Sequence, residues 1–216
     1  GVSPPAAPRV TPSDPPAGEP KADRSDEIFQ GGAIETVAEG LKFTEGPLWR
    51  PDGTLVFVDL SGDAVYQVDL KDGLKSRKPG EGVKALREKA GGPAGTAVDA
   101  QGRLLHAQFN GSVVRVNADG SVEVIADQLS GKKLNQPNDL VVRSDGSIFF
   151  TDFGKGATDD RIKSSGIYRI DPAGALHQLT TDIVSPNGLA FSPDERVLYV
   201  ALYAAAELRA YDVAQD

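Results

Sequence analysis

Three oxygen-bearing side chains occupy the same place in successive repeats of this chain. Glu45 lies in a Thr-Glu-Gly-Pro run, Asn138 in Pro-Asn-Asp-Leu and Asn187 in Pro-Asn-Gly-Leu. The equivalent residue of a fourth copy is Ala94, which has no side-chain oxygen. Carboxylate and amide oxygens, without histidine or cysteine, suit a hard cation such as Ca²⁺ better than Zn²⁺ or copper. The pattern therefore predicts that Glu45, Asn138 and Asn187 bind one divalent metal ion.

The elements that must position these residues are recurring hairpins. Each copy has an apolar run, a turn and a second apolar run, and the turn stands eight positions after the residue of interest. The turn residues are Gly53, Gly102, Gly146 and Glu195, at spacings of 49, 44 and 49 residues. This period is typical of the four-stranded blade of a β-propeller, in which equivalent positions converge on a central axis. The sequence therefore predicts an all-β propeller with about four blades.

Each of these polar residues has a simpler interpretation when it is taken alone. Asn or Asp before a strand often only closes an Asx-turn, and Gly and Pro beside it are ordinary turn residues. A turn does not need an oxygen acceptor at the same offset in different repeats. The shared register therefore favours a joint site.

Composition excludes several classes of function. The 216 residues carry a net charge of −8, which argues against a nucleic-acid partner. No apolar run reaches the roughly 18 residues of a membrane span. There is no cysteine, so a thiol nucleophile and a disulfide framework are both excluded. The sequence leaves the oligomeric state open.

The chain divides into a leader and one β domain. Residues 1–26 are rich in proline and read as a disordered leader, whereas residues 27–216 form the predicted propeller domain. Residues 33–38 alternate like a strand that would complete the last blade, because the fourth blade ends one strand short. Either the ring closes with four blades through this strand, or the chain is part of a larger ring.

The leader and the absence of methionine bear on processing and location. Without methionine, the first residue cannot be a translational start, so we expect a processed, engineered or partial chain. A proline-rich leader is typical of an exported domain, which favours a periplasmic or secreted protein. An expression remnant on a cytoplasmic protein is the alternative.

The motifs around Glu45, Asn138 and Asn187, in this order and spacing, resemble the SMP-30/gluconolactonase family over residues 33–213. The resemblance implies a six-bladed propeller that carries a divalent metal, usually Ca²⁺, and hydrolyses lactones or related esters. It also implies that Glu45, Asn138 and Asn187 are metal ligands. The family's remaining ligand, an aspartate proposed as general base, belongs to a later blade that we do not find in this sequence.

The resemblance implies further site residues and two departures from the family. Where relatives commonly have an asparagine that contacts the substrate or a metal-bound water, this chain has Ala94, and where many have a histidine after the second hairpin, it has Phe109, which follows Gln108. These three are candidate substrate-binding positions. Asp139, beside Asn138, is a candidate supporting carboxylate for catalysis, with a capped turn as the equal alternative.

Two histidines lie outside the candidate site. His106 would lie within a strand and His177 on an outer strand, so we interpret both as structural residues.

The sequence therefore favours a Ca²⁺-dependent hydrolase that opens a sugar lactone or related ester, with a small molecule as its partner. A non-catalytic propeller that serves as a binding scaffold and an inactive fragment of a longer lactonase are the alternatives. The chain lacks a Gly-x-Ser-x-Gly nucleophile motif and a His-Glu-x-x-His zinc motif, so no competing catalytic apparatus is visible.

Overall fold

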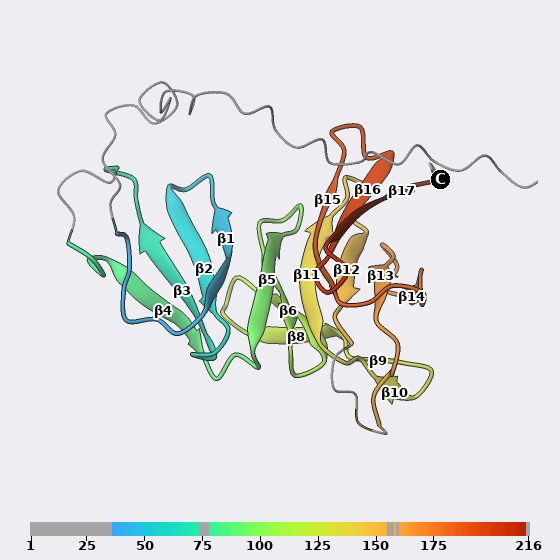
Figure 1. Ribbon diagram of the computed structural model, residues 1–216. Coiled ribbons are helices and arrows are strands. Elements are labelled where there is room, and N and C mark those ends of the chain that lie inside the picture. Colours follow the sequence, from blue (N-terminus) through green and yellow to red (C-terminus); the bar gives the residue numbers. More distant parts are fainter. Residues whose placement is uncertain (1–35, 74–77, 155–157, 159, 215–216) are drawn as a thin grey trace, which may run out of the picture. The chain divides into compact units, whose positions relative to one another are not determined.

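The computed structural model describes residues 36–73, 78–154, 158 and 160–214, which belong to one compact unit. These residues form antiparallel sheets in which consecutive strands are neighbours (Figure 1). The first sheet contains β1 (Thr44–Trp49), β2 (Thr54–Asp59), β3 (Ala64–Asp69) and β4 (Val83–Glu88). The second contains β5 (Pro93–Val98), β6 (Leu104–Gln108), β7 (Ser112–Val116) and β8 (Val122–Ala126).

The third sheet contains β11 (Pro137–Val142), β12 (Ile148–Asp152), β13 (Gly166–Ile170) and β14 (Leu176–Gln178). The fourth contains β15 (Pro186–Phe191), β16 (Val197–Leu202) and β17 (Glu207–Asp212). In the described part of the chain the fourth sheet has three strands, whereas each of the first three sheets has four. The described part of the chain has no helix that could cross a membrane.

The predicted turn residues all have left-handed backbones. The φ angles are +82°, +76° and +89° at Gly53, Gly102 and Gly146, and +57° at Glu195. A side chain in this region costs about 1 kcal/mol, which glycine avoids. Glu195 is held there because its carboxylate accepts hydrogen bonds from the backbone N–H of Ser144 at 2.9 Å and from the Ser144 hydroxyl. Glu195, the one turn residue of the four that is not glycine, therefore links the fourth sheet to the third.

The first strand of every sheet carries the same irregularity. Pairing with the second strand shifts between the second and fifth residues of β1, and between the first and fourth residues of β5, β11 and β15. Glu45, Ala94, Asn138 and Asn187 are each the second residue of their strand. Bulges redirect the side chains next to them. The equal register predicted from the sequence is therefore confirmed by equal strand geometry.

Hydrophobic clusters fill the spaces between successive sheets. Strand β12 contributes to two of them, because adjacent residues of a strand point to opposite faces. Phe150 packs with residues of the second and third sheets, whereas Phe149 packs with Leu189, Leu198 and Val200 of the fourth. A third cluster joins the first and second sheets. Stacking of this kind makes the first strands of neighbouring sheets contact one another in chain order.

Two details differ from the sequence predictions. Residues 36–38 form no strand, and the rest of the predicted closing strand, like the proline-rich leader, lies outside the described residues. A short hairpin, β9 (Gln128–Leu129) and β10 (Lys132–Lys133), was not predicted. Its turn residues Ser130 and Gly131 both have positive φ angles. Each strand has only two residues, too few for hydrophobic alternation to reveal it.

The third residue of the first strand of the second sheet, Gly95, lies close to the third sheet. A Cβ on Gly95 would lie 2.6 Å from Asp139 Cα and 2.9 Å from the Asn138 carbonyl oxygen. At the equivalent position of the fourth sheet, a Cβ on Gly188 would meet only Asp139 Oδ2, at 3.7 Å. The sheet interface therefore requires glycine at residue 95 but leaves space at residue 188.

We expect Gly95→Ala to destabilise the protein by about 2 kcal/mol, because backbone atoms of β11 must move to admit the methyl group. Gly188→Ala is the matched control and should change the free energy of unfolding by less than about 0.5 kcal/mol. Urea denaturation of both variants measures the difference. Equal effects of the two substitutions would contradict the proposed steric role of Gly95.

Candidate metal and lactone site

A cavity of about 350 Å³ lies beside the beginnings of the first strands. Its polar lining residues are Glu45, Gln136, Asn138 and Asn187. Its apolar and aromatic lining residues are Phe43, Leu60, Phe109, Phe153 and Tyr203. The structure therefore brings the three predicted metal ligands to the wall of one cavity, together with Phe109.

Asn138 provides the clearest sign that this cavity binds something. The residue is 4% exposed, and its side-chain oxygen Oδ1 has no hydrogen-bond partner. A buried amide oxygen without a partner costs on the order of 1–3 kcal/mol and is rare in folded proteins. A cation beside Oδ1 would remove this cost. The residues present therefore fit a bound metal ion.

Glu45 and Asn187 complete the set of oxygens. Burial, and secondarily the charge of Asp139, raise the pKa of the Glu45 carboxyl above its ordinary value. Close negative groups of this kind favour a bound cation. The backbone carbonyl oxygen of Asn187 accepts a hydrogen bond of 2.7 Å from the buried Thr151 hydroxyl, which ties β15 to β12 and leaves the Asn187 side-chain amide out of this bond.

The donor set depends on amide oxygens. Among the described residues, no three His, Cys, Asp or Glu side chains gather as a metal cluster would require. Glu45 is the sole carboxylate of the three predicted ligands. Oxygen donors with one charge suit Ca²⁺ at modest affinity and do not suit Zn²⁺.

The apolar side of the cavity is as regular as the polar side. Leu60, Phe109, Phe153 and Tyr203 directly follow the second strands β2, β6, β12 and β16. The backbone N–H of each donates a hydrogen bond of 2.8–3.0 Å to the carbonyl of the residue before the first strand of its own sheet. Of these four residues, the sequence predicts only Phe109 as part of the site. The pattern that marks the other three is a large apolar residue that recurs one position after each second strand.

Two buried aspartates hold the loops that carry this wall. Asp152 accepts hydrogen bonds from the N–H groups of Asn135 and Gln136, both at 2.7 Å. Asp59 makes the equivalent bonds, both at 2.9 Å, to Lys42 and Phe43. Burial raises the pKa of Asp152, whereas at Asp59 the donated hydrogen bonds outweigh burial and lower the pKa.

Asp139 is the third residue of β11, its carboxylate is bonded to β15, and it does not line the cavity. Its carboxylate accepts hydrogen bonds from the N–H groups of Leu140, at 2.9 Å, and Leu189, at 3.3 Å. Burial raises the pKa of Asp139. The residue therefore joins β11 to β15 and acts on Glu45 through its charge.

Two of the predicted substrate-binding residues are not brought to the cavity. Ala94 is fully buried within β5. Gln108 is also buried, where its amide nitrogen donates to the Ala90 carbonyl and its amide oxygen accepts from Ser112 at 2.8 Å. Both polar groups of Gln108 are thus engaged, one by Ala90 in the segment before β5 and the other by Ser112 of β7.

Both histidines lie in structural surroundings. His106 is 1% exposed, and its Nδ1 lies 3.2 Å from the Thr96 hydroxyl. Burial, helped by the charge of Arg87, lowers the pKa of His106 to about 4, so the ring is neutral at pH 7. His177 is exposed on the edge strand β14 and pairs with Asp171 at 3.0 Å.

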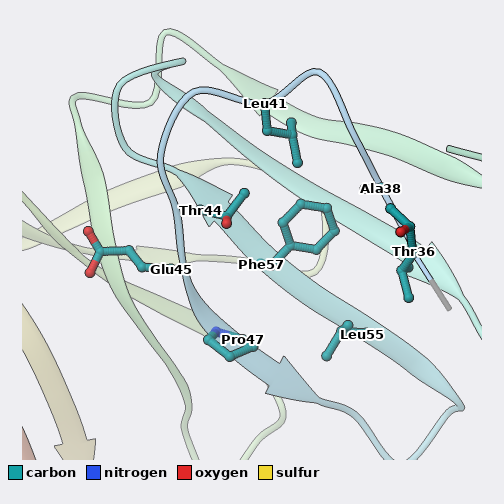
Figure 2. A pocket seen from close by; sticks show the side chains of 9 residues that line it. Thr36, Ala38, Leu41, Thr44, Glu45, Pro47, Leu55 and Phe57 are labelled. Carbon is teal, nitrogen blue, oxygen red and sulfur yellow. The ribbon is translucent and has the colours of Figure 1, made fainter. Parts of the chain in front are cut away.

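A second hollow, of about 400 Å³, lies between residues 36–41 and strands β1 and β2 of the first sheet, and Glu45 borders it as well. Figure 2 shows Leu41, Leu55 and Phe57 gathered there, with the Glu45 carboxylate pointing away from them. The hollow is apolar and has no converging polar groups, so the first cavity is the better candidate for chemistry.

Comparisons with known proteins identify the family to which the chain belongs. The model of the SMP-30/Gluconolactonase/LRE-like region matches residues 43–216. The chain is 30% identical over 182 residues to a gluconolactonase of Zymomonas mobilis, covering 78% of this chain and 51% of that protein. It is 26% identical to the lactonase drp35 of Staphylococcus saprophyticus, covering 85% of this chain and 55% of the relative.

Among solved structures, a gluconolactonase from Xanthomonas campestris superimposes with a TM-score of 0.71 at 34% identity. The match covers 83% of this chain and 61% of that structure. The chain thus spans about half the length of the curated relatives it matches. These likenesses and the repeated antiparallel sheets confirm the predicted all-β propeller of four-stranded blades. Since the family model matches most of its length, this chain belongs to the SMP-30/gluconolactonase/LRE-like family.

Proposed function

We propose that this protein binds Ca²⁺ through Glu45, Asn138 and Asn187 and hydrolyses a lactone or related ester. The observation that carries the proposal is the buried Oδ1 atom of Asn138, which has no partner in a cavity that Glu45 and Asn187 also line. Similarity to a gluconolactonase and to a lactonase supports the class of reaction.

The residues of the site would have different roles in catalysis. A divalent cation, when bound, would polarise the lactone carbonyl and stabilise negative charge on its oxygen. Glu45 would hold the cation with its charge, and Asn138 and Asn187 would orient it with their amide oxygens. Asp139, fixed by two backbone N–H groups, would position β15 against β11 and add negative potential.

The cavity wall would exclude bulk water around the ligand. Phe109 and Phe153 are half-buried and lie next to the polar residues on the same wall. In a drier site, the attraction between the cation and the carbonyl oxygen is less screened. The rate of lactone hydrolysis should therefore depend on these two aromatic residues as well as on the three proposed metal ligands.

Adding Ca²⁺ should raise the melting temperature and support lactone hydrolysis, because the cation binds the folded cavity and not the unfolded chain. The test compares the protein in Ca²⁺ and in excess chelator, with proton release from a panel of lactones followed in a pH-stat. Titration calorimetry gives the affinity. Unchanged melting temperature together with no turnover of any lactone would contradict the proposal.

A non-catalytic binding scaffold is the second candidate. It is favoured by the engagement of both polar groups of Gln108 and by the apolar Ala94, which together leave fewer polar groups for a substrate. In this case a ligand would bind with the same affinity in Ca²⁺ and in chelator, and no lactone would be consumed.

A further inference from the structure

We propose that the cavity selects lactones or esters with an apolar substituent over polyhydroxylated sugar lactones. This inference rests on the proposed function, since it concerns the substrate of the same site. The inference is drawn from a wall of large side chains on one side of the cavity. Each of the four sheets contributes one residue from the equivalent position: Leu60, Phe109, Phe153 and Tyr203.

Side chains of the wall approach one another across two of the sheet boundaries. The rings of Phe153 and Tyr203, from the third and fourth sheets, have centroids 6.2 Å apart. Leu60 and Phe109, from the first and second sheets, both approach Gly92, where a Cβ would lie 3.6 Å from Leu60 and 3.1 Å from Phe109. The same backbone hydrogen bond anchors each of the four residues. The fold itself therefore fixes the backbone from which the four side chains of the wall project.

Two of the aromatic rings at the cavity are unusually exposed. Phe43 is 54% exposed and Tyr203 is 74% exposed. Both line the cavity, so their exposed surface adjoins that of Phe109 and Phe153. Contiguous exposed apolar surface beside a polar centre is typical of a ligand site, because a bound apolar group removes it from water.

The polar side of the cavity has little capacity for hydroxyl groups. Glu45, Asn138 and Asn187 are assigned to the cation, which leaves the Gln136 amide and the Tyr203 hydroxyl among the described lining side chains. The hydroxyl groups of a sugar lactone outnumber these two groups. Each hydroxyl that is removed from water without a partner lowers affinity by on the order of tenfold. An alkyl or aryl substituent has no such requirement and gains contact with the rings.

The test uses lactones with one common six-membered ring: δ-valerolactone, δ-decalactone and glucono-1,5-lactone. We expect kcat/KM in saturating Ca²⁺ to be about tenfold higher for δ-decalactone than for either of the others. Tyr203→Ala should lower the value for δ-decalactone by about fivefold and leave that for δ-valerolactone nearly unchanged. Tyr203→Phe keeps the ring and should retain the wild-type preference.

Tyr199→Ala is the matched control, because Tyr199 is also an exposed tyrosine of the fourth sheet but does not line the cavity. It should leave all three substrates unaffected. A preference for glucono-1,5-lactone, or an equal loss in Tyr203→Phe and Tyr203→Ala, would overturn the inference.

Failure of the proposed function gives a different result. The lactams that correspond to δ-valerolactone and δ-decalactone resist hydrolysis, so their binding can be measured by calorimetry in an inactive protein. Tighter binding of the alkylated lactam that is lost in Tyr203→Ala would support the apolar preference even without turnover. Equal binding of the two lactams would overturn it.

Discussion

Replacing Glu45 by glutamine should lower the affinity of the cavity for Ca²⁺ by about 100-fold and reduce lactone hydrolysis to a similar extent. Glu45 is the sole carboxylate of the three proposed ligands, and the number of ligand charges helps to set Ca²⁺ affinity. Glutamine preserves the size of the side chain and one oxygen, so the loss isolates the charge. Calorimetric titration of Ca²⁺ into both proteins measures it.

The opposite charge change gives a second test of the same site. Asn187→Asp should raise Ca²⁺ affinity, because it adds a carboxylate at the equivalent position of β15. Glu123→Gln is the control for net charge, since Glu123 is an exposed residue of β8 that pairs with Arg115 at 3.3 Å. If Glu45→Gln and Glu123→Gln affect Ca²⁺ binding equally, Glu45 is not a ligand.

His106 should make the folded protein sensitive to mild acid. Its pKa is about 4 in the folded state against 6.5 for an ordinary histidine, so the unfolded chain binds more protons between these values. Stability is therefore fully present above pH 6.5 and is lost as the pH falls towards 4. At about 1.4 kcal/mol per pH unit, the loss is on the order of 3 kcal/mol.

His106→Gln should remove this component, because glutamine does not titrate and can still reach Thr96. Urea unfolding at pH 7, 6, 5 and 4 should show the stability gap between wild type and variant shrinking by about 3 kcal/mol. Asp139 and Asp152, whose raised pKa values act in the opposite direction, are common to both proteins and cancel. His177→Gln is the exposed control. A constant gap for His106→Gln would show that the buried ring does not resist protonation.

Substitutions of the proposed metal ligands should impair both Ca²⁺ binding and lactone hydrolysis. Substitutions in the apolar wall should change hydrolysis without changing Ca²⁺ binding. Glu45 and Asn138 are proposed to bind the cation, so their replacement should lower the hydrolysis rate of every substrate. Tyr203 is proposed to contact the apolar substituent, so its replacement should lower the hydrolysis rate only of substrates that carry such a substituent. This division gives a direct way to tell a metal defect from a specificity defect in any variant of the cavity.

Local rules made the repeat predictable. The turn at Gly53, Gly102 and Gly146 needs a left-handed backbone, and the flanking apolar runs follow from burial, so both appear in the sequence. Counting back eight positions from each turn places Glu45, Asn138 and Asn187 at the same residue of their strands. Rotational repetition then required them to lie near one another.

What the sequence determined by itself was the blade repeat, the register of its first strands and the family. Tertiary structure decided that both polar groups of Gln108 have buried partners, that Asp139 joins two strands, that Asn138 Oδ1 has no partner, and that four residues after the second strands line one cavity. The physical reason is that turn geometry and alternation depend on neighbours in the chain. Burial, charge interactions and hydrogen-bond partners depend instead on residues of other sheets, which no local pattern specifies.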